Sequence, residues 1–254
     1  MTTGLGEFFT EIDAPRKRLL FVNRSSSEAV HELLESVVGE GAVPVDELRL
    51  PAADEELVVL VDDEEVLAAS TVEELLQSVL LVNSDVYKTG ARPLDEVSVP
   101  AVLEGLDEVP FRVRGYPASD KEKLLLIAIS RLIERTAAEA DGGTLRASFQ
   151  RLSRLRDEQG TERVYRTVGA GGTDVHVYGV DDWHPPSAFP VTVHAGDAEP
   201  YRRSWFVVFT PAAGSDADPV ALVALETDAN CWKGFWTYRP ALVDRIDRYI
   251  ATEL

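Results

Sequence analysis

The stretch SDKEKLLLIAISRLIERTAAEA, residues 119–140, decides the fold class, because it predicts one long helix that is apolar on most of its surface. Ser119 and Glu122 are spaced as a capping box, which places the helix start at Ser119. Short strand-like segments follow, and they are DVHVYG from Asp174, RSWFVVF from Arg203, VALVALE from Val220 and GFWTY from Gly234. This order predicts an α+β fold in which helices back an antiparallel sheet in the C-terminal half.

The strand RSWFVVF is expected at the centre of this sheet. Alternation along a strand places Trp205, Val207 and Phe209 on one face. Phe206 and Val208 then lie on the other face, so both faces are apolar. The final segment, ALVDRIDRYIATEL, has its apolar residues on one helical face and is expected to close the sheet as a helix.

The segment TLRASFQRLSRL, residues 144–155, is interpreted as a second, arginine-rich helix. The apolar residues at helical spacing are Leu145, Phe149, Leu152 and Leu155. A further helix is predicted from Thr161 to Val168. The preceding long helix is expected to become exposed to solvent at its charged residues, which are Arg131, Glu134 and Arg135.

Residues 1–116 are expected to form a smaller α/β lobe. Its strand candidates are RLLFVN from Arg18, PVDELRL from Pro44, ELVVLVDD from Glu56 and VLAAS from Val66. Capping boxes predict one helix over residues 26–38 and another that begins after Thr71. Prolines and glycines between Val82 and Pro117 mark a connection to a second lobe, residues 117–254. One continuous domain is the alternative.

The two halves follow a similar order of segments. RLLFVN, PVDELRL, ELVVLVDD and VLAAS correspond in order to DVHVYG, PVTVHAG, RSWFVVF and VALVALE, and each series precedes a terminal helix. No residue identity supports a duplication. The order is therefore a hypothesis of two similar lobes around a central helical layer.

The chain is strongly acidic, with 44 acidic and 25 basic residues and a formal net charge of −19. Runs such as AADEE and VDDEE keep a surface hydrated, and molar salt screens their repulsion by shortening the Debye length to about 3 Å. This composition favours a salt-rich cytoplasm, with an ordinary acidic protein as the alternative. Nucleic acid is not expected as a partner, because phosphate contacts need a basic face.

A single cysteine, Cys231, excludes an intramolecular disulfide and a cysteine-based zinc site. The N-terminal residues MTTGLGEFFTEIDAPRKR lack the apolar region of a secretory signal. The strongest apolar run, Leu124 to Ile129, is far shorter than the ~20 residues that cross a bilayer. These features predict a cytoplasmic protein without a membrane partner.

Arginines between residues 146 and 166 form the one basic cluster of the sequence. Guanidinium groups bind phosphate or carboxylate bidentately, so this cluster suits an anionic ligand. Exposed ion pairs with neighbouring acids, each contributing ~0–1 kcal/mol, are the alternative. The expected ligand contacts are Arg146, Arg151 and Arg154.

Aromatic residues crowd the C-terminal strands. One face of the sheet is expected to pack on helices while the other lines a cavity for a flat ligand. The residues predicted to line it are Tyr178, Trp205 and Trp236. Packing in the core is the alternative for all three.

Histidines and hydroxyl residues give little sign of a reactive centre. His176 and His194 fall on neighbouring strand candidates, where they are expected to face one another. Metal sites usually need three or four converging ligands, and the sequence has no HxH or HExxH, so no metal is predicted. A triad of Ser204 or Ser187 with His194 and Asp197 lacks a GxSxG elbow, so no catalytic residue is assigned.

From about Arg112 to the C-terminus the chain resembles the DICT family, sensory domains that occur with diguanylate cyclases and two-component systems. The residues that carry the resemblance are GYPASDKEKLLLIAISRLIER, LRASFQRLSRLRDEQGTERVY, DVHVYGVDDW, RSWFVVF, VALVALE and GFWTYRPALVDRIDRYI. The resemblance implies a regulatory input domain, similar in style to GAF and PAS modules, without catalytic residues. The first half looks like the extension of stand-alone members from salt-loving microbes.

The sequence therefore favours a non-enzymatic sensory protein that binds a small molecule or a signalling partner. It contains no cyclase motif, kinase phosphoacceptor segment or helix-turn-helix, so a separate protein is expected to supply the output. The sequence identifies neither the ligand nor a cofactor. An interaction adaptor without its own ligand is the second hypothesis, and an enzyme of unrecognised type is the third.

Overall fold

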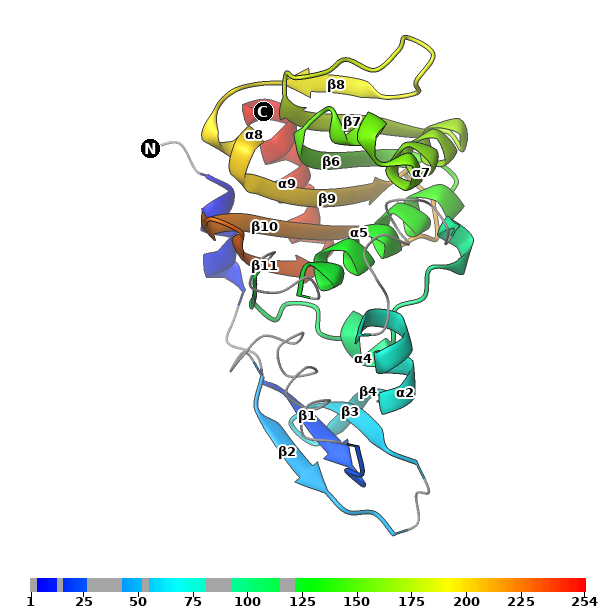
Figure 1. Cartoon of the computed structure of the whole chain (residues 1–254), viewed down its shortest axis with the longest axis vertical. Coiled ribbons are helices and arrows are strands. Elements are labelled where there is room, and N and C mark those ends of the chain that lie inside the picture. Colours follow the sequence, from blue (N-terminus) through cyan, green and yellow to red (C-terminus); the bar gives the residue numbers. More distant parts are fainter. Residues whose placement is uncertain (1–3, 13–15, 27–42, 52–54, 81–92, 115–121) are drawn as a thin grey trace.

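A computed structural model describes residues 4–12, 16–26, 43–51, 55–80, 93–114 and 122–254. Within these residues the chain forms a four-stranded sheet in its first half and a seven-stranded sheet in its second. Figure 1 shows the small sheet at one end of the molecule and the large sheet at the other, with short helices between them.

The large sheet has the strand order β5-β11-β10-β9-β6-β7-β8. Its strands are β5 (Phe111–Arg114), β6 (Gly143–Arg151), β7 (Thr173–Val180), β8 (Thr192–Ala195), β9 (Ser204–Pro211), β10 (Val220–Asp228) and β11 (Cys231–Thr237). Neighbouring strands are antiparallel except β6 with β7 and β7 with β8, which run parallel. The predicted α+β fold is confirmed as a mostly antiparallel sheet backed by helices.

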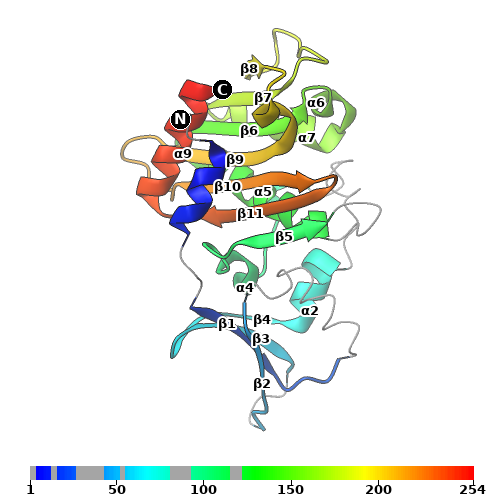
Figure 2. The same cartoon turned by 90° about the vertical axis from the view of Figure 1, so that its left-hand side faces the viewer.

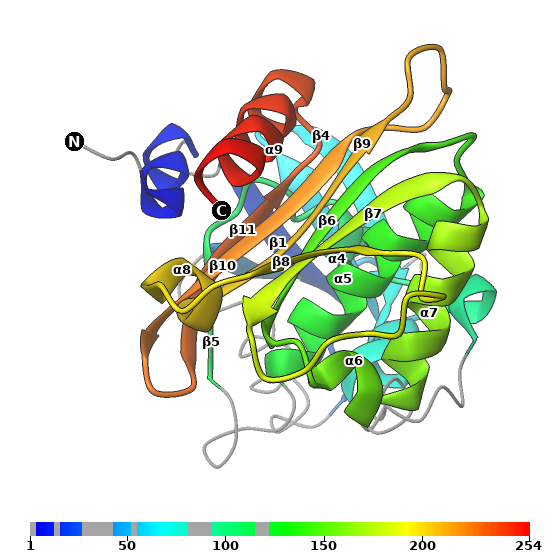
Figure 3. The ribbon, with the colours of Figure 1, turned by 90° about the horizontal axis from the view of Figure 1, so that it is seen from above.

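Helices cover both faces of the large sheet. On one face lie α5 (Glu122–Glu139) and α7 (Gln159–Ala170). On the other face lie α9 (Pro240–Glu253) and the 3-10 helix η1 (Leu5–Glu11). Figure 2 shows α9 and the blue η1 side by side, and Figure 3 shows the sheet between them and the α5 layer. Two short helices, α6 (Arg154–Asp157) and α8 (Glu199–Arg203), lie in the connections.

Strand β9 lies at the centre of the sheet, between β10 and β6. Val207 and Phe209 belong to the core on the α5 side, whereas Phe206 and Val208 belong to the core on the α9 side. The prediction of a central strand with two apolar faces is confirmed. The predicted closing helix is confirmed as α9, which packs on β9 and β10.

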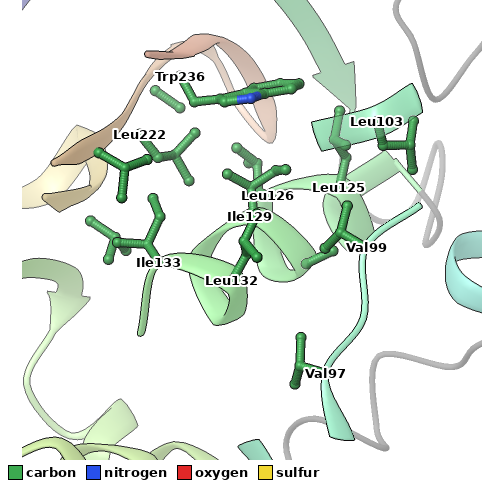
Figure 4. Packing of buried hydrophobic residues seen from close by; sticks show 14 of the residues in the cluster. Val97, Val99, Leu103, Leu125, Leu126, Ile129, Leu132, Ile133, Leu222 and Trp236 are labelled. Atoms are coloured by element: carbon green, nitrogen blue, oxygen red, sulfur yellow. The ribbon is translucent and has the colours of Figure 1, made fainter. Parts of the chain in front are cut away.

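Helix α5 is the main packing element of its layer. Figure 4 shows its side chains Leu125, Leu126, Ile129, Leu132 and Ile133 among residues from the sheet and from the segment before β5. All five are at most 4% exposed. A helix that is apolar on most sides is stable only when it is covered on most sides, as predicted for this helix.

The helix predicted over residues 144–155 is wrong for most of its length, because Gly143–Arg151 forms strand β6. This strand pairs with β9 on one side and β7 on the other. Leu145 and Ala147 join the core on the α5 side, while Arg146 between them faces the α9 side. The spacing of four between Leu145 and Phe149 fits a period of two as well as a helix, so pairing with two neighbours decided between them.

The small sheet has the order β2-β1-β3-β4. Its strands are β1 (Lys17–Val22), β2 (Val45–Leu48), β3 (Leu57–Asp62) and β4 (Glu65–Thr71), as the sequence predicts. The helical segments of this region are α2 (Val72–Leu75), the π-helical turn η2 (Leu76–Leu80), the 3-10 turn η3 (Leu94–Glu96) and α4 (Ala101–Glu104).

The capping box at Thr71 is confirmed. The Glu74 amide donates to Thr71 Oγ1 at 3.0 Å, and the Thr71 amide donates to Glu74 Oε2 at 2.8 Å. The helix predicted over residues 26–38 lies outside the described residues apart from Ser26, and so does the predicted helix start at Ser119.

The described part of the expected connection contributes a strand to the large sheet. Phe111 of β5 lies opposite Gly234 of β11. A Cβ atom at Gly234 would lie 2.4 Å from the Phe111 ring, so this pairing requires glycine. One hydrophobic core also joins Leu60 of β3 to Leu126 of α5. Residues on both sides of position 116 therefore share one sheet and one core.

The two sheets have related strand orders. The strands that correspond to β2-β1-β3-β4 in the sequence are β8, β7, β9 and β10, and they follow the same order once β6 is left out. The pairs β1 with β2 and β7 with β8 are both parallel. Strand β6 separates β7 from β9, so the duplication stays a hypothesis.

Candidate functional site

The three aromatic residues predicted to line a pocket lie on both faces of the large sheet. Tyr178 of β7 belongs to the core on the α9 side, and its ring contacts Phe206 edge-on at 5.4 Å. Trp205 of β9 and Trp236 of β11 face the α5 side. The sheet therefore lies between Tyr178 and the two tryptophans.

Trp236 lies deep in the core, with 1% of its surface exposed. Its indole Nε1 donates to the carbonyl oxygen of Glu104 at 3.3 Å, and its ring centroid lies 5.6 Å from that of Phe111. Figure 4 shows the indole facing the aliphatic side chains of α5. These contacts are typical of a packed core residue.

Trp205 connects the sheet to α5. Its Nε1 donates to Ser130 Oγ at 3.0 Å. Its ring also meets that of Trp232 edge-on, with centroids 6.1 Å apart. Trp205 is half-buried, so it lies nearer to solvent than Trp236 does.

Arg146 and Tyr178, predicted as parts of one site, do meet on the α9 side of the sheet. Arg146 Nη1 donates to the Tyr178 hydroxyl at 3.0 Å, and Arg146 Nε lies 2.7 Å from Asp247 Oδ1 of α9. Burial alone would lower the pKa of Arg146, but Asp247 and Tyr178 together outweigh it and the pKa is raised. Burial likewise raises the pKa of Tyr178. The guanidinium is thus held by groups of the protein itself.

The two histidines predicted to face one another do so at the β8 edge. His176 Nδ1 lies 2.9 Å from His194 Nε2, and His176 Nε2 lies 3.0 Å from Asp174 Oδ2. The His194 ring stacks on Tyr178 with centroids 4.4 Å apart. Burial lowers the pKa of His194, and the nearby His176 and Arg146 lower it further. A row of polar groups therefore runs from Asp174 to Arg146.

The other predicted arginine contacts lie apart from Arg146. Arg151 is exposed at the end of β6, and Arg154 is half-buried at the start of α6. Two further arginines of the cluster form exposed ion pairs, Arg156 with Asp157 at 2.8 Å and Arg166 with Glu162 at 2.9 Å. Arg146 is thus engaged by Asp247 and Tyr178 on the α9 side, and a shared ligand contact of Arg146, Arg151 and Arg154 stays a prediction.

A buried polar network joins α5 to α7, and sequence reasoning missed it. Arg131 and Glu134 were expected in solvent, which is wrong, because they are 7% and 3% exposed. Arg131 Nη1 donates to Glu134 Oε2 at 2.5 Å, and Tyr165 of α7 donates from its hydroxyl to Glu134 Oε1 at 2.8 Å. Arg131 Nη2 also donates to Thr161 Oγ1 at 2.8 Å.

The network satisfies charges that burial would otherwise make costly. Burial alone would lower the pKa of Arg131, but Glu134, together with Tyr165 and Glu158, outweighs it and the pKa is raised. Burial raises the pKa of Tyr165 well above its ordinary value, so this hydroxyl stays a donor. A sequence signal existed, since Arg131 and Glu134 are one turn apart within a helix apolar on most sides.

A surface hollow of about 220 Å³ lies beside this network, where η3, α5 and α7 meet. Its lining residues are Pro93, Leu94, Asp95, Arg135, Ala138, Glu139, Gly160, Arg163, Val164 and Thr167. Arg135 follows Glu134 of the network directly, and Val164 precedes Tyr165. The hollow and the network therefore share the same two helices.

Described protein groups contact only part of the Arg135 guanidinium. Its Nη1 donates to the carbonyl oxygen of Val97, and its Nε lies 3.9 Å from Glu139 Oε1. Nε itself is buried without a hydrogen-bond partner among the described residues. This arginine at the hollow therefore keeps hydrogen-bonding capacity that the described protein groups do not use.

The described residues contain no group of three or more His, Cys, Asp or Glu side chains placed to hold a metal ion. None of the helices in these parts of the chain is both long enough and apolar enough to cross a membrane.

A helix-covered, mostly antiparallel sheet with a hollow at its helical layer is consistent with a sensory domain of the PAS and GAF kind. Residues 102–224 match the family model DICT, described as "Sensory domain in DIguanylate Cyclases and Two-component system". This match runs from α4 into β10, and it confirms the expected resemblance to the DICT family over that segment. DICT is a sensory domain family, so a sensory or regulatory role is supported.

Similarity to other known proteins is weak. No curated protein matches the chain. Among solved structures, the polyphosphate kinase from Porphyromonas gingivalis is similar over 60% of this chain at 14% identity, with a TM-score of 0.37. The chain spans 24% of that protein, and a similarity of this size carries no inference about fold or activity.

Proposed function

We propose that this protein is a non-enzymatic intracellular sensor that binds a small molecule and acts on a separate signalling protein. The observation that carries the proposal is the hollow between η3, α5 and α7, because both helices lie in the segment that matches a sensory domain family. Ligand sites are usually concave and combine apolar surface with polar groups that orient the ligand, and this hollow offers both.

Helix α5 is suited to pass on a change at the hollow. It contacts α7, β9, β10 and β5, so it connects the hollow to the middle and one edge of the large sheet. A ligand acts only to the extent that it binds two arrangements of these elements with different affinity. The buried hydrogen bond from Tyr165 to Glu134 joins α5 and α7, so a change in their spacing alters it.

An interaction adaptor is the second candidate, and one observation favours it. Strand β4 is an edge strand of the small sheet, and its Val66 and Leu67 are 63% and 43% exposed. Unpaired edges with exposed apolar residues are sites where another chain can add a strand. Partner binding that is independent of any small molecule supports the adaptor over the sensor.

Native mass spectrometry tests the choice. The protein is produced in a host with a salt-rich cytoplasm and is sprayed from concentrated ammonium acetate, with an absorbance spectrum recorded first. A stoichiometric bound compound supports the sensor and identifies the ligand class. A clean ligand-free protein that still captures a signalling partner contradicts the sensor and supports the adaptor.

A further inference from the structure

We infer that the hollow between η3, α5 and α7 binds a small zwitterion with an apolar body, of which an apolar α-amino acid is the simplest kind. This inference rests on the proposed sensory function and adds the chemical class of the ligand. It follows from the size of the hollow, from its apolar floor and from the two signs of charge around it.

The size of the hollow limits the ligand. Its volume of about 220 Å³ lies below the ~300–1,000 Å³ of sites for drug-sized molecules. Nucleotides and flat aromatic cofactors exceed what it encloses. A single amino acid or a metabolite of similar size remains.

The lining places apolar groups between charges of both signs. Leu94, Ala138 and Val164 supply apolar surface from η3, α5 and α7 in turn. Arg135 and Arg163 carry positive charge, and Asp95 and Glu139 carry negative charge. A simple anion would meet two carboxylates here, and a simple cation would meet two guanidinium groups.

A zwitterion matches this distribution. Its carboxylate suits the guanidinium groups, which bind carboxylates through parallel hydrogen bonds. Its ammonium group suits Asp95 and Glu139, while its side chain covers the apolar surface. Arg135 can meet the carboxylate, because it lines the hollow and 29% of its side chain is exposed.

The position of the hollow links such a ligand to the buried network. Arg135 and Glu134 are consecutive on α5, and Val164 and Tyr165 are consecutive on α7. A ligand that draws Arg135 and Val164 together changes the spacing of α5 and α7. The Tyr165 to Glu134 hydrogen bond, 2.8 Å long, joins the same two helices and responds to that spacing.

Isothermal titration of the full chain with L-leucine, in high salt, tests the ligand class. Two analogues each lack one charge: 4-methylpentanoate has no ammonium group, and isoamylamine has no carboxylate. We expect both to bind at least about tenfold more weakly than leucine, because a charge-assisted hydrogen bond exceeds the ~1.4 kcal/mol that corresponds to tenfold. Equal binding of leucine and 4-methylpentanoate overturns the inference, as does absence of leucine binding up to about 10 mM, ten times a Kd of ~1 mM.

Variants locate the site. Arg163→Gln and Ala138→Leu are expected to weaken leucine binding about tenfold or more, the first by removing a guanidinium and the second by filling the hollow. Arg166→Gln is the matched control, because Arg166 is an exposed arginine of α7 that pairs with Glu162 and is not part of the lining. Unchanged binding in both test variants, with thermal unfolding as in the parent protein, overturns the assignment of the site.

The inference and the proposed function fail in different ways. A different compound found by native mass spectrometry, together with no response to leucine, rejects the zwitterion and leaves the sensor in place. A protein that holds no compound and responds to none of the three probes rejects both.

Discussion

Arg131 and Glu134 lie one turn apart on α5 and form an ion pair, Nη1 to Oε2 2.5 Å, with side chains only 8% and 3% exposed. The Tyr165 hydroxyl donates to the second oxygen of the same carboxylate. The ion pair lies within α5, and its two side chains join α5 to α7 through hydrogen bonds to Thr161 and Tyr165. Breaking a buried pair is costly because the remaining charge is left without a partner.

Arg131→Met is therefore expected to lower the free energy of unfolding by about 3–5 kcal/mol. Adding Glu134→Leu to this variant is expected to recover part of the loss, because no buried charge is then left unpaired. Chemical denaturation of both variants measures the two effects. A matched control is Arg248→Met, since the Arg248–Asp244 pair is 66% and 58% exposed, and its loss is expected to cost ~0–1 kcal/mol. An Arg131→Met loss no larger than this control contradicts the structural role of the buried pair.

Trp236→Ala distinguishes a core residue from a pocket residue. The burial of Trp236 predicts a loss of about 3–5 kcal/mol in the free energy of unfolding. Trp236→Phe keeps most of the apolar volume and is expected to cost less. Circular dichroism during thermal unfolding checks both. An Ala variant that unfolds at the parent temperature and only loses a ligand response supports the pocket.

The His194 environment predicts a stability loss in mild acid. Burial, His176 and Arg146 lower the pKa of His194 below its ordinary 6.5, so the unfolded chain binds a proton before the folded chain does. Stability is complete above about pH 6.5 and falls as the pH drops from there toward the folded pKa.

His194→Gln removes this titration. Between about pH 7.5 and 5.5, where ordinary carboxylates change little, the parent protein is expected to lose more stability than the variant does. Urea denaturation at a series of pH values compares the two. Parallel curves show that His194 contributes nothing to the pH dependence.

The acidic composition predicts a salt requirement. With a net charge of −19, repulsion destabilises the folded chain at low ionic strength, and screening relieves it. The midpoint of urea unfolding is expected to rise between about 0.1 M and about 1 M potassium chloride. A flat or falling midpoint argues for an ordinary acidic protein.

Several elements could be predicted because their signals are local. Thr71 and Glu74 have the spacing of a capping box, and both hydrogen bonds form. Alternation along RSWFVVF shows apolar residues on both faces, which only a central strand covered on each side can bury. His176 and His194 were likewise predicted to meet because they fall on neighbouring strand candidates, and they do meet.

The candidate site could be predicted only in part. Arg146 and Tyr178 do meet, but Asp247, 101 residues away from Arg146, holds the guanidinium. The hollow escaped prediction, because its lining comes from three separate elements. No spacing within one segment carries such a signal.

The sequence by itself determined the apolar spine at α5, the capping box, the central strand β9 and the closing helix α9, since each follows from the periodicity of neighbouring residues. Only the tertiary structure decided that residues 143–151 form a strand, because their apolar spacing suits both periods and the pairing of β6 with β7 and β9 selects one. It also decided that Arg131 and Glu134 are buried. Their charges are tolerable inside the fold because they pair with each other and because α7 brings Thr161 and Tyr165 to them, a contact that depends on packing between distant segments.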